Sequence, residues 1–368
     1  MQHIGVGVVG LRRGERLAKA IQTCDGAEVR ALCDQDPIRL AAAEPLGVEN
    51  RYTHFDEMLD REDLDLVVIA TATRLHAEMV LAAAARKPAG ILCEKPFATN
   101  MGEAEAMLAV CDRSEVKLAI GFQGRHYPAL VRARDLVADG AIGRPLAVSA
   151  SVAEGGLLNQ GSHLIDRALY VLGDPEPRWV LGQLQRETDR YERGTVCEDL
   201  CMGIALVGEG TRIAFDCDIG HAGPVADGAF VIAGEDGMMF IEPCRELGLT
   251  AYSLTVASAA GKSLELGPGD LPEVNADVEQ IVEMIAWIRG ESGNRQDAHV
   301  CIKSHAIIMG IYESARTHTL VHMPLLTKES PLASMVADGH LRVRHPGRYD
   351  IRHRTAFEPE KLDMASGH

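Results

Sequence analysis

Lys95 follows a short apolar run, Gly90 to Cys93, that has the composition of a buried β-strand. Pro96 comes next and stops the strand from continuing, because proline cannot donate a ladder hydrogen bond. Ligands of open α/β sheets bind beyond the carboxyl ends of the strands, so Lys95 would carry an ammonium group into that crevice. The alternative is an ordinary surface lysine at a strand end, and Glu94-Lys95-Pro96 alone does not separate the two.

A second candidate is the segment 155–166, Gly-Gly-Leu-Leu-Asn-Gln-Gly-Ser-His-Leu-Ile-Asp. Its Asn159 and His163 are four residues apart on a predicted helix, so their side chains share one face. An amide and an imidazole on the same face can together hold a hydroxyl group. Alternatively, His163 is a hydrogen-bonded core histidine and Asp166 a structural partner.

A glycine-containing turn, residues 10–14, joins a predicted strand at 4–9 to a predicted helix at 15–23. We expect Gly10 to end the strand and Gly14 to open a helix whose N-terminus faces a pyrophosphate. The dinucleotide-binding fingerprint is degraded, because Arg12 replaces the middle glycine and Glu15 the third. The turn is therefore weak evidence without further support.

Asp34 provides that support, because it ends the second predicted strand 20 residues after Gly14. An acidic side chain at this spacing accepts hydrogen bonds from the ribose diol of an adenosine. Its charge repels a 2′-phosphate and favours NAD, although Arg12 and Arg13 could pair with one and leave NADP possible. Asp34 could also be a helix N-cap or turn residue before Pro37.

The fourth predicted strand ends in a turn of small residues, 70–76, that would let the backbone approach a dinucleotide closely. The alternative is an ordinary helix start capped by Thr73, with His76 in the first turn. We expect residues of these turns to contact the cofactor, namely Gly10, Leu11, Arg12, Arg13, Asp34, Thr71, Thr73, His76, Glu94, Lys95 and Gln123.

The elements that would position these residues divide the chain of 368 residues at about residue 122. Residues 1–122 alternate apolar runs with helical periodicity, which predicts a doubly wound parallel sheet of the Rossmann type. Residues 123–336 contain mostly strands with glycine-rich turns and two late helices, which predicts an α+β domain with an open, largely antiparallel sheet. The basic stretch that begins at 337 is expected to be a solvated C-terminal tail, 337–368, or to clasp a neighbouring subunit.

Composition excludes several functional classes. The net charge of −16 opposes a nucleic-acid surface, because phosphate binding needs clustered lysine and arginine. No apolar run is long enough to span a bilayer and the N-terminus lacks a signal-like segment, so we expect a cytoplasmic protein without a membrane partner. The nine cysteines contain no CxxC pair and predict reduced thiols, and we expect no metal.

Six ordered motifs together resemble the Gfo/Idh/MocA oxidoreductases over nearly the whole chain. They are the predicted Rossmann unit, Glu94-Lys95-Pro96, Gly121-Phe122-Gln123-Gly124-Arg125, residues 161–166, Glu198-Asp199 and residues 311–316. The resemblance implies an NAD- or NADP-binding N-terminal domain, a C-terminal sheet through which subunits form a homodimer or homotetramer, and a sugar or cyclitol substrate.

The resemblance also implies that Lys95 and His163 are catalytic. His163 suits the general base that removes a hydroxyl proton as hydride leaves for the nicotinamide, and Lys95 would stabilise the charge that develops on the same oxygen. Many family members have aspartate at the position of Asn159, which can orient a hydroxyl but cannot accept its proton.

We expect the substrate to contact Lys95, Arg125, Tyr127, Asn159 and His163, with Trp179 as a further wall residue. Two other functions stay open beside the dehydrogenase. The first is an enzyme that keeps its NAD bound and cleaves glycosides or eliminates without net redox change. The second is a nucleotide-sensing regulator without catalysis.

Overall fold

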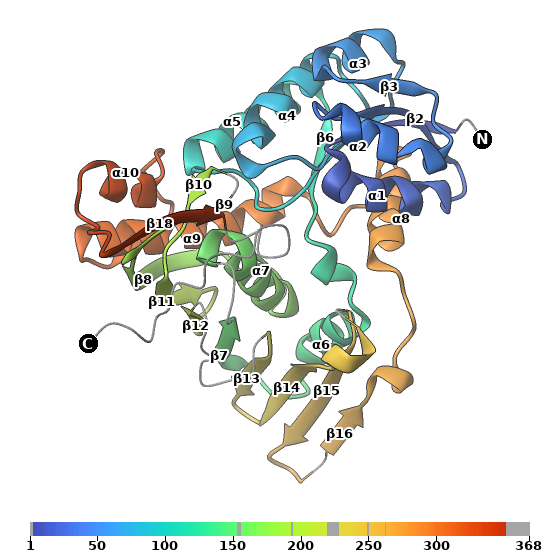
Figure 1. Ribbon diagram of the computed structural model, residues 1–368. Coiled ribbons are helices and arrows are strands. Elements are labelled where there is room, and N and C mark those ends of the chain that lie inside the picture. The colour runs from blue at the N-terminus through green and yellow to red at the C-terminus, as the bar shows by residue number, and fades with distance from the viewer. Residues whose placement is uncertain are drawn as a thin grey trace.

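The computed structural model describes residues 3–152, 156–192, 194–218, 228–248, 250–261 and 263–350, which form two α/β halves (Figure 1). The first half contains a six-stranded parallel sheet with the order β3-β2-β1-β4-β5-β6. Its strands are β1 (Ile4–Val9), β2 (Ala27–Cys33), β3 (Asn50–Tyr52), β4 (Leu66–Ile69), β5 (Gly90–Cys93) and β6 (Lys117–Ile120). Its helices are α1 (Leu11–Gln22), α2 (Pro37–Ala42), α3 (Phe55–Arg61), α4 (His76–Ala85) and α5 (Met101–Ser114).

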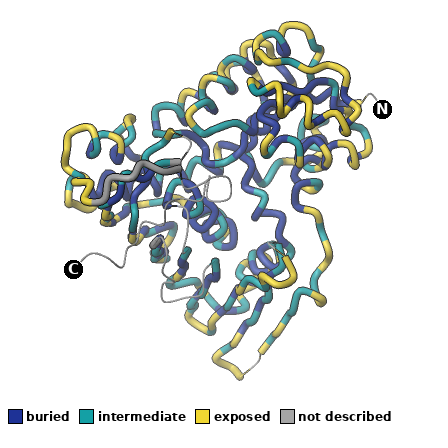
Figure 2. Tube along the Cα trace, viewed as in Figure 1, coloured by how far each residue is buried: buried dark blue, intermediate teal, exposed yellow. Residues whose placement is uncertain are grey.

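This sheet confirms the predicted doubly wound parallel fold. Strands β1, β4 and β5 are buried along their whole length, as expected for strands covered on both faces (Figure 2). The strand order reverses between β1 and β4. Ligands of such folds bind at the carboxyl ends of the strands beside this switch point.

The second half contains a nine-stranded sheet with the order β16-β15-β14-β13-β7-β12-β11-β8-β17. All its pairings are antiparallel except that of β7 with β12, so the predicted largely antiparallel sheet is confirmed. Its strands are β7 (Pro145–Val152), β8 (Pro177–Gln185), β11 (Leu200–Val207), β12 (Thr211–Asp218), β13 (Phe230–Gly234), β14 (Gly237–Pro243), β15 (Tyr252–Ser258), β16 (Ser263–Leu266) and β17 (Val321–His322). The helices are α6 (Pro128–Ala138), α7 (Ser162–Val171), α8 (Ala276–Ile288), α9 (Ala298–Thr317) and α10 (Pro331–Ala337).

A small third sheet has the order β10-β9-β18, with β9 (Thr188–Glu192), β10 (Thr195–Val196) and β18 (His345–Asp350). Strand β18 pairs in parallel with β9, so residues 345–350 are not the solvated tail that the sequence predicted. The basic composition that suggested a tail does not prevent a strand from pairing with an available edge. The rest of the expected tail, residues 351–368, lies outside the described residues.

Helix α8 comes late in the chain but packs on the first half. Its Ile281, Met284 and Ile285 lie in the same apolar core as β1 and β2. Gly90 at the start of β5 accommodates this helix, because a Cβ at that position would come 2.3 Å from the terminal methyl of Met284. Strand β6 of the first sheet ends at Ile120 and α6 packs in the core of the second half, so the chain first crosses between them and crosses back at α8.

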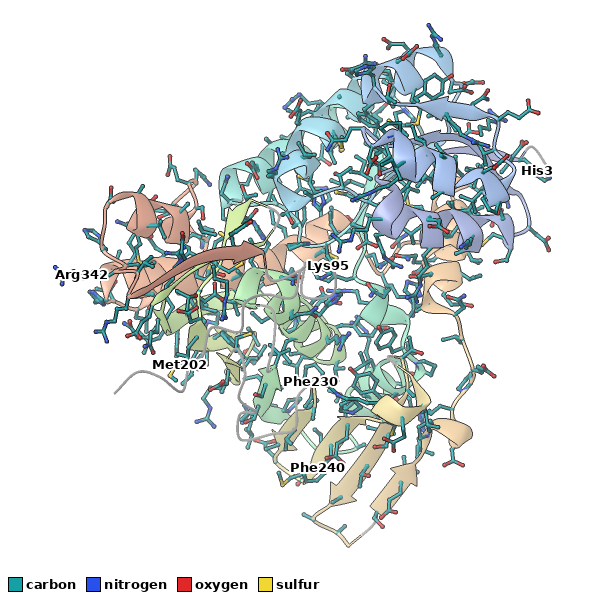
Figure 3. The ribbon with its side chains drawn as sticks, in the orientation of Figure 1. His3, Lys95, Met202, Phe230, Phe240 and Arg342 are labelled. Atoms are coloured by element: carbon teal, nitrogen blue, oxygen red, sulfur yellow. The ribbon has the colours of Figure 1, made fainter. Side chains whose placement is uncertain are left out.

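One face of the nine-stranded sheet stays open to solvent. On β11, Cys201 and Ala205 are buried on the helix side, whereas Met202 and Ile204 are exposed. Figure 3 shows Met202 at the outer edge of this half, far from Lys95. Leu181 on β8 is also exposed and lines a shallow apolar hollow of about 390 Å³ on this face.

Candidate active site

The turn between β1 and α1 is tighter than the sequence predicted. Helix α1 begins at Leu11, and Gly10 makes the turn with a left-handed φ of 88°. A Cβ at Gly10 would come 2.6 Å from the carbonyl oxygen of Ala70, so only glycine fits. The expectation that Gly14 opens the helix is wrong. Gly14 is buried within α1, where a Cβ would come 2.8 Å from Val8, so its missing side chain brings the helix close to β1.

Asp34 is buried at the end of β2 and holds the first turn of α1. Its Oδ2 accepts a hydrogen bond from the backbone N–H of Leu11 at 2.8 Å, and its Oδ1 accepts one from the N–H of Asp36 at 2.9 Å. The N-cap of α2 is Asp36, not Asp34. Asp34 lines a cavity of about 690 Å³, and each of its carboxylate oxygens can accept a further hydrogen bond.

This first cavity lies beside β1, β2 and β4. It is lined by Val9, Gly10, Arg12, Cys33, Asp34, Gln35, Arg39, Thr53, His54, Phe55, Ala70, Thr71, Ala72, Arg74, Leu75 and Met79. The sequence predicted Gly10, Arg12, Asp34 and Thr71 at such a site. Thr73 lines neither this cavity nor the second one described below.

His76 was expected at the cofactor and is instead completely buried. Its Nδ1 lies 2.9 Å from the carbonyl oxygen of Pro96 and its Nε2 lies 3.3 Å from that of Thr71. Burial lowers the pKa of His76, so the ring is neutral near pH 7. His76 therefore ties the turn after β4 to the turn after β5 and positions Thr71 and Lys95 without lining either cavity.

Glu94 and Arg13 form a partly buried ion pair at the end of β5, and Arg13 links this pair to helix α8. The Nε of Arg13 donates to Glu94 at 2.8 Å, and its two terminal nitrogens donate to Asp277 of α8 at 2.6 and 3.0 Å. Burial alone would raise the pKa of Asp277, but the hydrogen bonds from Arg13 and Arg16 lower it. These contacts fix the strand end that carries Lys95.

Lys95 reaches from β5 to the second half of the molecule (Figure 3). Its Nζ donates to the side-chain oxygen of Asn159 at 3.1 Å and contacts the backbone oxygen of the same residue at 3.3 Å. Asn159 is buried in a π-helical turn, Gly156–Gly161, that runs directly into α7. Such turns are frequent at functional sites. Gly155, which the sequence motif included, lies outside the described residues.

Glu198 holds this π-helical turn and was absent from the predicted site residues. One of its carboxylate oxygens accepts the N–H of Leu157 at 2.5 Å, and the other accepts the hydroxyl of Tyr312 on α9 at 2.9 Å. Burial raises the pKa of Glu198. Glu198 and Tyr312 both belong to motifs that carried the family resemblance, and that resemblance was the signal that could have identified them.

His163 lies in the first turn of α7 and lines a second cavity of about 700 Å³ between the halves. The edge of its ring faces Phe122, with 6.1 Å between the ring centres. The cavity is lined by Arg12, Arg13, Arg16, Ala70, Thr71, Glu94, Lys95, Gln123, Tyr127, Val152, Gln160, His163, Leu164, Arg167, Gly228, Pro243, Arg245, Gly248 and Tyr252. Lys95, Tyr127 and His163 therefore share one cavity, and Arg12, Ala70 and Thr71 line both cavities.

The structure does not place Arg125 on the cavity wall, where the sequence analysis expected it. Its side chain is 1% exposed and forms a buried ion pair with Asp166, with Nη2 and Oδ1 2.7 Å apart. A second contact joins it to Asp174 at 2.9 Å. Arg167, one residue beyond Asp166, lines the cavity instead. Trp179 lies on β8 opposite His322 and does not line the cavity either.

The described residues show neither of two other kinds of site. They contain no group of three or more histidine, cysteine, aspartate or glutamate residues arranged to hold a metal ion. They also contain no helix that is long and apolar enough to cross a membrane.

The sequence of this chain is similar to those of known proteins. Residues 4–122 match the GFO_IDH_MocA family, an oxidoreductase family with an NAD-binding Rossmann fold, which confirms the resemblance found in the sequence. A D-apiose dehydrogenase of Paraburkholderia graminis is 29% identical over 86% of this chain and 89% of its own length. A myo-inositol 2-dehydrogenase of Thermotoga maritima is 29% identical over 46% of this chain and 55% of its own length.

Solved structures confirm the fold. A levoglucosan dehydrogenase in complex with NADH and levoglucosan superposes with a TM-score of 0.74 at 22% identity, covering 88% of this chain and 100% of the other. At this level of identity the similarity shows the fold alone.

Proposed function

We propose that this chain, which belongs to the Gfo/Idh/MocA oxidoreductases, transfers hydride between a secondary alcohol of a sugar or cyclitol and NAD. The observation that carries the proposal is the meeting of Lys95 from the first half and His163 from the second at one cavity, with the buried Asn159 accepting a hydrogen bond from Lys95. The relatives that act on apiose and inositol support this substrate class over a glycoside-cleaving enzyme or a regulator.

The residues of the first cavity fit a dinucleotide. Because Gly10 has no side chain, a ligand can approach the backbone of the turn before α1. The N-terminus of this 12-residue helix favours a pyrophosphate. Asp34 is suited to accept hydrogen bonds from the adenosine ribose and disfavours a 2′-phosphate, so we propose a preference for NAD over NADP. Gln123 supports a ligand at the second cavity, because its buried side-chain oxygen has no hydrogen-bond partner among the described residues.

The second cavity supplies the groups that oxidation of an alcohol needs. When bound, NAD accepts the hydride. His163 would take the hydroxyl proton, and Lys95 would donate a hydrogen bond to the same oxygen and stabilise its developing charge. Asn159 orients the Lys95 ammonium through its side-chain oxygen but cannot remove the proton, so His163 is the proton acceptor of this group.

Substitution of Lys95 by methionine tests this assignment. It removes the charge and keeps most of the side-chain volume, so we expect kcat for sugar or polyol oxidation to fall by about 10²- to 10³-fold. NADH affinity, measured by fluorescence titration, should change little because Asp34 and the α1 turn stay intact. Full activity of Lys95→Met would overturn the assignment, and wild-type turnover without added NAD would favour the enzyme that retains its cofactor.

We further propose that the open face of the nine-stranded sheet joins subunits into a homodimer or homotetramer. Leu181, Met202 and Ile204 place exposed apolar side chains on that face, as expected of an association surface. Sedimentation of the wild type and of Met202→Glu tests this, with dissociation of the variant as the expected result. Eight of the nine free cysteines are buried, which favours a reducing compartment such as the cytoplasm.

A further inference from the structure

The cavity that holds Lys95 and His163 is basic, although the protein as a whole carries a net charge of −16. Among the lining side chains that the structure describes, Glu94 is the only carboxylate, against Arg12, Arg13, Arg16, Lys95, Arg167 and Arg245. A cleft lined by one sign of charge concentrates ligands of the opposite sign. The cavity therefore favours an anionic ligand more than the composition of the chain suggests.

Several of these cations are already balanced. Arg13 pairs with Glu94 and Asp277, and the Nε of Arg16 lies 2.5 Å from Asp277. Arg12 lines both cavities, where it is placed to meet the phosphates of a dinucleotide. These three arginines lie on the cofactor side of the cavity. They do not account for the positive charge on the opposite wall.

Arg167 supplies that charge from α7. Its guanidinium lies between two aromatic rings, 5.0 Å from the centre of Tyr127 and 5.8 Å from that of Tyr252. It donates one hydrogen bond, from Nη1 to the hydroxyl of Tyr252 at 2.8 Å. Within the described ranges it forms no ion pair and its Nε has no hydrogen-bond partner. The adjacent carboxylate, Asp166, is engaged by Arg125.

Gly124 keeps this arginine in place. A Cβ at Gly124 would come 2.6 Å from the Nε of Arg167, so any larger residue would displace the guanidinium. Burial alone would lower the pKa of Arg167, and the nearby Tyr252, Tyr127 and Asp166 raise it, but no described carboxylate forms a direct ion pair with its guanidinium. The fold thus holds at the cavity wall a cation that an anionic ligand would neutralise.

The position of Arg167 relates this cation to the reacting end of the substrate. Arg167 follows His163 by four residues on α7, so the two side chains lie on the same face of the helix, one turn apart. A ligand whose hydroxyl lies at His163 and Lys95 can therefore present a second group to Arg167. The wall beyond Arg167 is completed by Arg245, from the segment that joins β14 to β15, and by Tyr252, the first residue of β15.

We propose that the substrate carries an anionic oxygen group, a carboxylate or a phosphate, and that Arg167 binds it while the alcohol is oxidised at His163 and Lys95. The identity of the reacting end rests on the proposed function. The guanidinium is suited to this task because it can donate two parallel hydrogen bonds to two oxygens of the anion.

The test uses the full chain saturated with NADH and sugars that differ only at C6. D-Glucose, D-glucuronate and D-glucose 6-phosphate form one series, and D-galactose, D-galacturonate and D-galactose 6-phosphate form a second. Calorimetric titration measures binding, and the same sugars with NAD measure hydride transfer by absorbance at 340 nm. We expect at least one anionic sugar to bind 10-fold or more tightly than its neutral counterpart, and the uronate and phosphate arms identify the anion.

Three variants assign the preference to Arg167. Arg167→Met should reduce the preference to less than threefold, and Arg167→Lys should retain part of it. Gly124→Ala keeps every charge but displaces the guanidinium, so it should reduce the preference as Arg167→Met does. NADH affinity is the control for folding, because the Asp34 cavity is separate from these positions.

Each outcome has a distinct meaning. Equal or tighter binding of the neutral sugars, no binding of any sugar, or an anion preference that survives Arg167→Met overturns the proposal. Tight, Arg167-dependent binding of an anionic sugar without any change at 340 nm supports the anion site and counts against the proposed dehydrogenase. Binding with hydride transfer supports both.

Discussion

The two walls of the active-site cleft are built in different ways. The cofactor wall consists of the turns that follow β1, β2 and β4, and the hydrogen bond from the N–H of Leu11 to Asp34 joins the first two of these turns. The substrate wall is assembled from elements far apart in sequence, which bring His163, Arg167 and Tyr252 together from α7 and the β14–β15 region. A shared backbone arrangement serves a common cofactor, whereas separate side chains can set the choice of substrate.

Substitution of His163 by alanine, which changes the substrate wall, should have the largest effect on activity. We expect kcat to fall by about 10³-fold, because a positioned general base contributes 10²- to 10⁴-fold. NADH affinity should stay within about twofold of the wild-type value, since His163 does not line the first cavity. Steady-state kinetics and fluorescence titration make the comparison, and a matching loss of NADH affinity would contradict the separation of the two walls.

Substitution of Asp34 by asparagine probes the cofactor wall. Its single side-chain oxygen can accept the N–H of Leu11 or that of Asp36 but not both, and the charge that repels a 2′-phosphate is removed. We expect the ratio of kcat/KM for NADP to that for NAD to rise by about 10- to 100-fold, in line with the energy of hydrogen bonds to charged groups. The ranking of sugar substrates should not change. A changed ranking would show that the two walls are coupled.

Substitution of Glu198 by glutamine tests whether a buried residue outside the cavity positions the substrate wall. Glutamine can accept one of the two hydrogen bonds, from Leu157 or from Tyr312, but not both through its single oxygen. We expect kcat to fall by about 10-fold without loss of NADH affinity, because Asn159 lies in the π-helical turn that Glu198 holds. Tyr312→Phe, which removes one hydrogen bond, should have a smaller effect in the same direction.

His305 contacts both halves of the molecule, so its protonation should change the stability of the protein. It lies on α9, and its Nε2 is 3.1 Å from the carbonyl oxygen of Asn100, the N-cap residue of α5. Burial lowers the pKa of His305 to about 4, so the folded state binds this proton less readily than the unfolded state does. Stability from this group is present above the unfolded pKa of about 6.5 and is lost as the pH falls towards 4.

We expect this group to reduce the free energy of unfolding by about 0.7 kcal/mol between pH 7 and pH 6. His305→Gln keeps a hydrogen-bond donor and removes the titration, so its denaturation curves should depend less on pH in this interval. His126, whose pKa burial lowers to about 3, stays in both proteins and contributes equally. An unchanged pH dependence in the variant would show that His305 does not contribute.

The cofactor wall was largely predictable from the sequence, because its residues follow recognisable strands at short, regular spacings. Gly10, Asp34 and Thr71 line the expected cavity. Thr73 and His76 were also expected there but line neither cavity, since a turn sequence does not show which side chains face a cavity and which face the protein. His76 turns inward to two carbonyl groups that the sequence places 5 and 20 residues away.

The substrate wall was predictable only where a motif carried it. Lys95, Tyr127 and His163 line the cavity and Asn159 bonds to Lys95, and their roles remain predictions until the variants are measured. Arg125 and Arg167 show the limit of prediction from the sequence. Both are arginines next to the site, and only the carboxylate with which one of them pairs decides which arginine reaches the cavity. Asp166 pairs with Arg125 across 41 residues, and no local pattern reveals that pairing.

The return of α8 to the first half determines how this enzyme can be divided or recombined. A fragment that ends at residue 122 would lose Ile281, Met284 and Ile285 from its apolar core and Asp277 from its ionic contact with Arg13. The cofactor-binding unit is therefore discontinuous in sequence. Chimeras that exchange substrate domains within this fold must carry residues 276–288 with residues 1–122, because the last helix of the first domain is encoded after most of the second.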